Sequence, residues 1–190
     1  MGVFVLDLET GGLDPKECDI FSISCVYSTK EEPVADIIEI HTLEKYPRIE
    51  RSLLQSGFPY ERYLNRENFS RSVEPSEAIH RLEDFFTKHM HKQEQFVFVG
   101  QNFICFDAVF LRTFYERHGW KHLLNNKKSI IEDTKHMART LANEGRIKLK
   151  KFSLVNLCEH FQIELGDESH TAIGDAIATA KVYWELKKHM

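Results

Sequence analysis

The strongest constraint on the fold is a short apolar run at residues 3–8, which Asp7 alone interrupts. Such a nearly continuous run is typical of a β-strand that is buried on both faces. Residues 19–27 and 35–43 are two further β-like runs, and residues 30–33 between them contain a proline and three charged residues that predict a turn. The close spacing of the three runs indicates an antiparallel meander of three strands.

Helical and β-like segments alternate after this meander. Pro75 suits a first helical position, and apolar residues from Ile79 to Met90 recur at helical spacing. The segments expected further along are a strand at 96–99, a helix at 106–117, a strand at 129–131, a helix at 134–143 capped by Asp133, a helix capped by Ser153 and a last helix around 176–184. This order predicts a single α/β domain over residues 1–190, with helices on the faces of a mixed sheet.

The composition is that of an ordinary globular protein, with 42% hydrophobic and 28% charged residues. No apolar run approaches the roughly 20 residues that a membrane span requires, and the N-terminus lacks the basic flank of a signal peptide. The four cysteines form no CxxC pair, which favours reduced, packed thiols over a zinc or redox site. We therefore expect an intracellular protein without a membrane partner, in the cytoplasm or the nucleus.

The net charge of −4 limits the ways in which the chain can bind nucleic acid. Coating a long duplex by bulk electrostatics requires a basic surface, so the acidic balance argues against it. Gripping a chain end in a small pocket is compatible with this charge, because metal ions can supply the positive charge there.

The tripeptide Asp7-Leu8-Glu9 places two acids at the end of the first strand. Strand side chains alternate between the two faces, so both carboxylates point the same way. Two carboxylates near a core repel each other and lose hydration, and a bound divalent cation would remove that conflict. The alternative is that the strand has ended and both acids are solvated.

The next four residues, Thr10, Gly11, Gly12 and Leu13, form a loop with little side-chain bulk. Such a backbone can approach a phosphate or a sugar closely and donate its amide groups, while Leu13 could wedge against a terminal base. A plain Gly-Gly turn is the alternative.

Further polar residues are expected at the same end of the sheet. Asn102 follows the strand at 96–99, and Asp107 lies in the first turn of the next helix, where α/β sheets place ligands. The alternative role for Asp107 is to stabilise the helix dipole. Residues five apart on one helix diverge by roughly 140°, so His170 and Asp175 converge only if His170 lies in the loop before the last helix.

Together these motifs resemble those of the DnaQ-like, DEDDh-type 3′–5′ exonucleases, a family that includes proofreading domains, RNase T and oligoribonuclease. The motifs are DLETGG from residue 7, the segment 102–107 and the stretch from His170 to Thr179, so the resemblance spans nearly the whole chain. It implies a ribonuclease H-like α/β fold. This is a mixed five-stranded sheet, with three antiparallel strands and then two parallel ones, flanked by helices.

The resemblance also implies the chemistry of the site. Asp7, Glu9, Asp107 and Asp175 would hold two divalent metal ions, Mg²⁺ or Mn²⁺, and His170 would be the general base. Four oxygen ligands without cysteine suit these ions, and two ions can clamp the attacking and leaving oxygens of an in-line displacement. The substrate-binding residues would be Thr10, Gly11, Gly12, Leu13, Asn102 and Phe106.

Residues 44–71 depart from the family pattern, because they lack the His-Gly-Ile-Thr-like stretch of many relatives. They carry six basic residues against four acidic ones, with interleaved aromatics that suit sequence-tolerant binding of a single strand. The residues of this expected substrate lid are Phe58, Tyr60, Tyr63 and Phe69. The alternative is a helical insertion that packs its aromatics into the core. A second basic cluster, Arg146, Lys148, Lys150 and Lys151, suits either substrate phosphates or solvent.

The function expected from these motifs is hydrolysis of phosphodiester bonds at the 3′ end of single-stranded DNA or RNA, with release of nucleoside 5′-monophosphates. The alternatives are a proofreading subunit that works mainly through a polymerase partner, and a non-catalytic nucleic-acid-binding relative. A homodimer is also compatible with the sequence.

Overall fold

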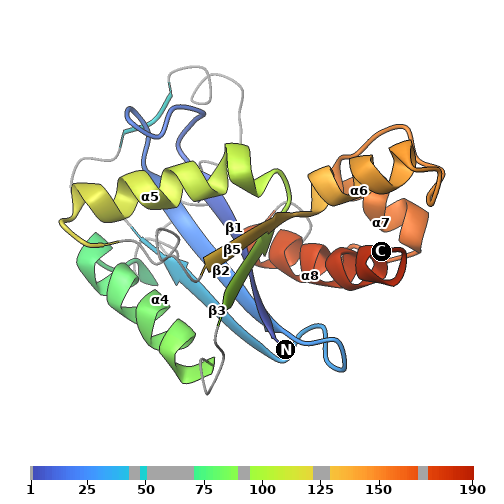
Figure 1. Ribbon diagram of the computed structural model, residues 1–190. Helices are drawn as coiled ribbons and strands as arrows, with labels where there is room; N and C mark the ends of the chain where they lie inside the picture. The colour runs from blue at the N-terminus through green and yellow to red at the C-terminus, as the bar shows by residue number, and fades with distance from the viewer. Residues whose placement is uncertain (1, 43–47, 51–70, 90–94, 122–128, 167–170) are drawn as a thin grey trace.

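A mixed five-stranded sheet forms the centre of the computed structural model, which describes residues 2–42, 48–50, 71–89, 95–121, 129–166 and 171–190 (Figure 1). The strand order is β3-β2-β1-β4-β5. The central strand β1 (Val3–Thr10) pairs antiparallel with β2 (Ile20–Ser28) and parallel with β4 (Phe96–Gly100).

The two outer strands complete the expected arrangement. β3 (Asp36–His41) pairs antiparallel with β2, and β5 (Ser129–Asp133) pairs parallel with β4. The sheet therefore has three antiparallel strands followed by two parallel ones, which confirms the predicted ribonuclease H-like fold class. β5 runs two residues beyond its predicted end, so Asp133 both ends this strand and begins the next helix.

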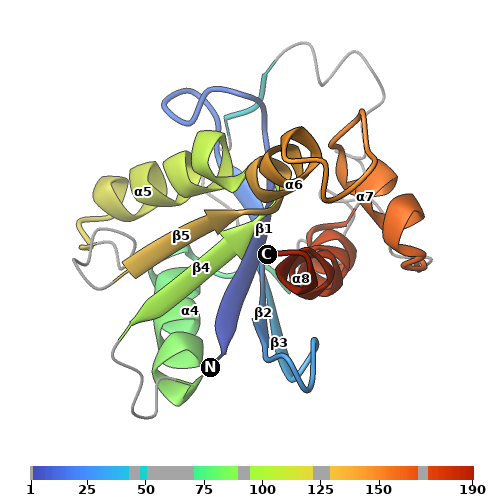
Figure 2. The same cartoon turned by 45° about the vertical axis from the view of Figure 1, so that its right-hand side comes forward.

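Helices cover both faces of the sheet, and their bounds are α4 (Pro75–His89), η1 (Phe103–Cys105), α5 (Asp107–Arg117), α6 (Thr134–Asn143), α7 (Leu154–Phe161) and α8 (Ala172–Lys188). Figure 2 shows α4 and α5 on one side of the sheet and α8 on the other, with α6 and α7 beside α8. None of the described helices is long and apolar enough to span a bilayer.

The alternation of β1 side chains explains this layering. Phe4, Leu6 and Leu8 pack into the core shared with α4 and α5, whereas Val3 and Val5 pack into the core shared with α8. Residues 7 and 9 continue the second set, because side chains two apart point to the same face of a strand. The acids of β1 therefore lie on the face that α8 covers.

Local signals at the helix ends behave as predicted. The Asp133 side chain accepts hydrogen bonds from the backbone N–H groups of Lys135 and His136, and the Ser153 side chain accepts one from that of Asn156. The helix expected from residue 106 begins instead at Asp107, after the short turn η1. This turn changes the direction of the chain between β4 and α5.

Candidate active site

Asp7 and Glu9 occupy the end of β1, and each side chain is partly exposed. Leu8 between them is buried in the core on the opposite face. The acids therefore lie where the α8 side of the sheet opens to solvent. This confirms the predicted alternation and gives both carboxylates access to a ligand.

Asp107 reaches the same place from α5. Its side chain is only 3% exposed, and its Oδ1 accepts a hydrogen bond of 3.1 Å from the backbone N–H of Leu8. This bond joins residues that lie 99 positions apart in the sequence. It fixes the first residue of α5 against the strand that carries the first two acids.

Asp175 approaches from the first turn of α8. The Thr171 side chain caps this helix by accepting a hydrogen bond of 3.2 Å from the backbone N–H of Gly174. Ala172 and Ala176 are fully buried. Because these side chains are small, the start of α8 can lie close to β1 and bring Asp175 toward the other carboxylates.

The pKa values of two acids show that the carboxylates interact. Burial raises the pKa of Asp7 well above its usual range, and the nearby charges of Asp107, Asp175 and Glu9 raise it further. Burial likewise raises the pKa of Asp107 to about 7, although the hydrogen bond from Leu8 opposes this change. Ionisation of Asp7 and Asp107 is therefore disfavoured among the four predicted ligands.

A divalent cation would relieve this repulsion, and the donor set suits one. All four groups are hard oxygen donors, which Mg²⁺ and Mn²⁺ prefer. Among the described residues, no three His, Cys, Asp or Glu side chains are already arranged to hold an ion. The residue types of the four carboxylates suit a cation, and their assignment as its ligands stays a prediction.

The predicted general base and the predicted lid are not part of this geometry. His170 lies outside the described residues, as do Phe58, Tyr60, Tyr63 and Phe69. Their assignments stay predictions.

The glycines of the loop at residues 10–13 pack closely against other parts of the chain, and their predicted contact with a substrate stays a prediction. Gly11 and Gly12 are buried, and a Cβ on Gly12 would lie 2.6 Å from Cys18 Sγ. A Cβ on Gly11 would lie 2.6 Å from the carbonyl oxygen of Arg48. Packing against neighbouring segments of the chain thus explains why both positions require glycine. Leu13 is 77% exposed, as its expected role requires.

Asn102 and Phe106 flank the turn η1, between β4 and α5. Asn102 has a left-handed backbone with φ of 62°, and its Oδ1 accepts a hydrogen bond of 3.0 Å from Lys135 Nζ. Phe106 is partly buried, and its ring centroid lies 4.9 Å from that of Phe110. The predicted position of Asn102 at the strand end is confirmed.

Asp133 does more than the predicted helix capping. Its Oδ1 also accepts a hydrogen bond from the backbone N–H of Asn102, and its Oδ2 accepts one from that of Ile104. It therefore holds the turn that leads to Asp107. The sequence signal was an acid directly between a strand and a helix, but the contact with residues about 30 positions earlier depends on the pairing of β4 with β5.

A cluster around Asp19 was missed by the sequence reasoning. Asp19 is 2% exposed, and its Oδ1 accepts a hydrogen bond of 2.6 Å from Arg117 Nη1. Its Oδ2 accepts one of 2.7 Å from the backbone N–H of Arg48, whose side chain also binds Asp19. The backbone N–H of Gly11 donates to the Asp19 carbonyl, and that of Glu50 donates to the Gly11 carbonyl. These contacts hold residues 48–50 and the end of α5 against the segment from Gly11 to Asp19, which follows the acids of β1.

Comparison with known proteins identifies the family. The sequence matches a family model described as RNase_T, Exonuclease, over residues 65–183. A search of curated proteins found no match.

Solved structures share the fold at low sequence identity. Exonuclease I of E. coli, in complex with a dT13 oligonucleotide, superimposes with a TM-score of 0.78 at 16% identity, over 99% of this chain and 41% of that one. Exonuclease I from Methylocaldum szegediense gives 0.77 at 16% identity, over 98% and 40%. The nuclease domain of 3′hExo, a DEDDh family member bound to rAMP, gives 0.72 at 12% identity, over 98% and 92%.

The chain thus spans about two fifths of the length of the Exonuclease I chains. At these identities the structural likeness shows the fold, while the family match covers more than half of the sequence. The protein belongs to the DnaQ-like exonuclease family and has a ribonuclease H-like fold.

Proposed function

We propose that the protein is a metal-dependent 3′–5′ exonuclease that shortens single-stranded DNA or RNA and releases nucleoside 5′-monophosphates. The observation that carries this proposal is the hydrogen bond that holds Asp107 against the Leu8 backbone, between Asp7 and Glu9 on β1. The charge of Asp175 is also near enough to raise the pKa of Asp7. Ionising neighbouring carboxyl groups costs free energy, and a bound cation would lower this cost. Membership of an exonuclease family supports phosphodiester hydrolysis as the reaction.

The four acids would share the metal-binding role. Asp7, Glu9, Asp107 and Asp175 would hold two Mg²⁺ or Mn²⁺ ions. When bound, such ions supply the positive charge that stabilises the attacking and leaving oxygens in phosphodiester hydrolysis. The hydrogen bond from Leu8 to Oδ1 holds the Asp107 carboxylate beside Asp7 and Glu9.

His170 would accept the proton of the attacking water. Histidine has an ordinary pKa near ~6.5, so it can act as a base at neutral pH and loses this capacity when it is protonated at lower pH. In the sequence it stands five residues before Asp175. We expect the rate to fall as the pH drops below neutrality.

The residues around the acids would bind the end of the strand. The exposed Leu13 side chain would contact the terminal base, and the Asn102 amide would bind the backbone beside it. Phe58, Tyr60, Tyr63 and Phe69 are proposed to stack on further bases. Residues 48–50, directly before this segment, contact the loop at residues 10–13, which supports a place for it near the site.

Related structures support a single-stranded substrate. Exonuclease I of E. coli has been solved with dT13 and dA16 oligonucleotides, and a zinc-bound complex with single-stranded DNA is also known. The nuclease domain of 3′hExo was solved with rAMP. Both DNA and RNA are therefore included in the proposal.

An end-labelled assay tests it. DNA and RNA oligomers labelled at the 5′ end and incubated with Mg²⁺ or Mn²⁺ should give ladders that shorten from the 3′ terminus. Excess EDTA should abolish the ladder, and His170→Ala should lower the rate by about 10²- to 10⁴-fold without loss of folding. Asp7→Asn should also weaken metal binding, whereas Asp36→Asn on the outer strand β3 serves as the control. Full activity in EDTA, or shortening from the 5′ end, would refute the proposal.

A further inference from the structure

We infer that one basic surface beside the site binds the substrate strand on the 5′ side of its terminal nucleotide. We call it the α6 basic face, and its members are Lys135, Arg139, Lys148, Lys150 and Lys151. The inference rests on the proposed exonuclease function and deepens it, because it names the part of the molecule that holds the remainder of the strand.

The α6 basic face begins at the site itself. Lys135 lies in the first turn of α6, and its Nζ donates a hydrogen bond of 3.0 Å to Asn102 Oδ1. Asn102 stands five positions before Asp107, on the turn that Asp133 holds in place. The first cation of the face is therefore fixed beside the predicted binding position of the strand end.

The second member continues the face along the helix. Arg139 is four residues after Lys135, so the two side chains lie on one side of α6. The Arg139 guanidinium carbon lies 5.7 Å from the centroid of the Phe152 ring. An arginine over an aromatic ring offers both charge and a stacking surface to a nucleotide.

The loop after α6 returns to the same strand end. The Gln101 side chain donates a hydrogen bond of 2.7 Å to the carbonyl oxygen of Phe152, and it accepts one of 2.6 Å from Thr134 Oγ1. Phe152 is therefore held beside Gln101, the neighbour of Asn102, although 51 positions separate Phe152 from Gln101 in the sequence.

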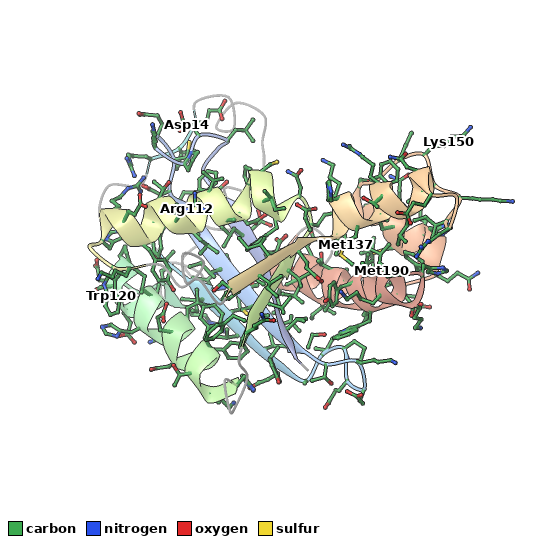
Figure 3. The ribbon with its side chains drawn as sticks, viewed as in Figure 1. Asp14, Arg112, Trp120, Met137, Lys150 and Met190 are labelled. Atoms are coloured by element: carbon green, nitrogen blue, oxygen red, sulfur yellow. The ribbon has the colours of Figure 1, made fainter. Side chains whose placement is uncertain are left out.

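Burial decides which way the loop lysines point. Ile147 is buried, and Leu149 packs against the core between α6, α7 and α8. Lys148, Lys150 and Lys151 are exposed, and Figure 3 shows Lys150 projecting outward from this loop. The apolar residues thus anchor the segment, and the lysines between and after them face solvent.

Arg146, a member of the predicted basic cluster, is left out of the face because its side chain is paired within the protein. Its Nε lies 3.0 Å from Glu144 Oε2. Its Nη1 donates to the carbonyl oxygens of His189 and Met190. These contacts join the loop to His189 and Met190, and Glu144 offsets the charge of Arg146.

The acids that the structure describes near the α6 basic face are paired with other groups. In residues 129–152, Asp133 is buried as a cap, Glu132 pairs with Lys187 at 3.1 Å, and Glu144 pairs with Arg146. In the described part of the chain, no carboxylate forms an ion pair with any of the five members of the face. This concentration of positive charge stands out in a protein whose net charge is −4.

A polyanion that continues from the carboxylate site is the ligand that this face suits. A single strand whose last nucleotide occupies the site has further phosphates on its 5′ side, and lysines spaced along a surface bind phosphates without sequence preference. An acidic peptide would match the charge but has no reason to extend from a phosphodiester site. We therefore commit to single-stranded nucleic acid.

Binding in EDTA separates this inference from catalysis. The ligand is a fluorescent thymidine oligomer of about 12 nucleotides, long enough to extend beyond the site. The face variant is Lys148→Glu/Lys150→Glu/Lys151→Glu. The matched control is Lys30→Glu/Lys121→Glu/Lys181→Glu, which changes three exposed lysines elsewhere and alters the net charge equally.

The face variant should bind the oligomer at least about tenfold more weakly than the control. The slope of log affinity against log salt concentration should fall in magnitude by about 2, since each lost phosphate contact contributes about 0.7 for a single strand. Cleavage of a dinucleotide, which is too short to reach the loop, should stay unchanged. Equal weakening in both variants, or an equal loss on the dinucleotide, would overturn the inference. Salt-sensitive binding without any cleavage would leave the face intact and refute the exonuclease proposal instead.

Discussion

Replacing Asp107 by asparagine should stabilise the metal-free protein at alkaline pH. The Asn side chain has nearly the same shape, and its Oδ1 can still accept the hydrogen bond from the Leu8 N–H. What the replacement removes is the cost of ionising a carboxyl group that is 3% exposed and has other acids nearby. A residue proposed to bind metal thus lowers the stability of the protein without metal.

The magnitude follows from the pKa of Asp107. An aspartate pKa of 3.8 in the unfolded chain rises to about 7 in the folded protein. Between these values the folded state binds more protons than the unfolded state, so stability falls as the pH rises and stays low above pH 7. This difference in pKa corresponds to a loss of stability of about 4 kcal/mol, at 1.36 kcal/mol per unit of pKa. The value is an upper limit, because Asp7 lies nearby and its own titration is coupled to that of Asp107.

Urea unfolding followed by circular dichroism in EDTA measures this effect. Asp107→Asn should exceed the wild type by up to about 4 kcal/mol at pH 8 and by less than about 1 kcal/mol at pH 4. Added Mg²⁺ should stabilise the wild type at pH 8 more than the variant, because ligand binding stabilises only a folded state that has the site. A variant no more stable than the wild type at pH 8, or equally stabilised at both pH values, would show that ionisation of Asp107 carries no such cost.

Two further replacements test the packing around the loop at residues 10–13. Asp19→Ala should lower the free energy of unfolding by about 3 kcal/mol, because it removes the buried partner of Arg48 and Arg117. Asp36→Ala, at a more exposed ion pair, should lower it by less than about 1 kcal/mol in the same urea titration. Similar losses for both would argue against the buried cluster. Gly12→Ala should lower the free energy of unfolding by about 1–3 kcal/mol in thermal unfolding, because its Cβ would collide with Cys18 Sγ. Gly166→Ala, which has open space around it, should leave the stability nearly unchanged. An equally neutral Gly12→Ala would contradict the close packing.

Much of the fold could be predicted because its signals are local. The period of two in β1 placed Asp7 and Glu9 on one face, and the apolar run before them indicated a buried central strand. Asp133 and Ser153 were recognised as helix caps because a cap depends on backbone groups only two or three residues away. The order of strands and helices followed from the same short-range patterns.

The roles of other residues depended on partners that no local pattern names. The glycines of the loop at residues 10–13 indicated a position with little room for a side chain, but the sequence does not name the neighbours that leave no room, Cys18 and the backbone at residue 48. Asp19 gave no signal, because its partners Arg48 and Arg117 come from segments about 30 and 98 positions away. Arg146 looked like its basic neighbours until its contacts with the end of the chain were visible.

The sequence by itself determined which side chains share a face of each element, because strand and helix geometry repeats every two or 3.6 residues. It also determined the residue types of the acidic motifs, and through them the family. Only the tertiary structure decided which faces meet: Asp107 on the Leu8 backbone, Asp175 beside β1, and Lys135 against Asn102. These contacts join segments that are distant in the chain. They depend on which apolar surfaces are buried together, and the local periodicity of the sequence does not determine that.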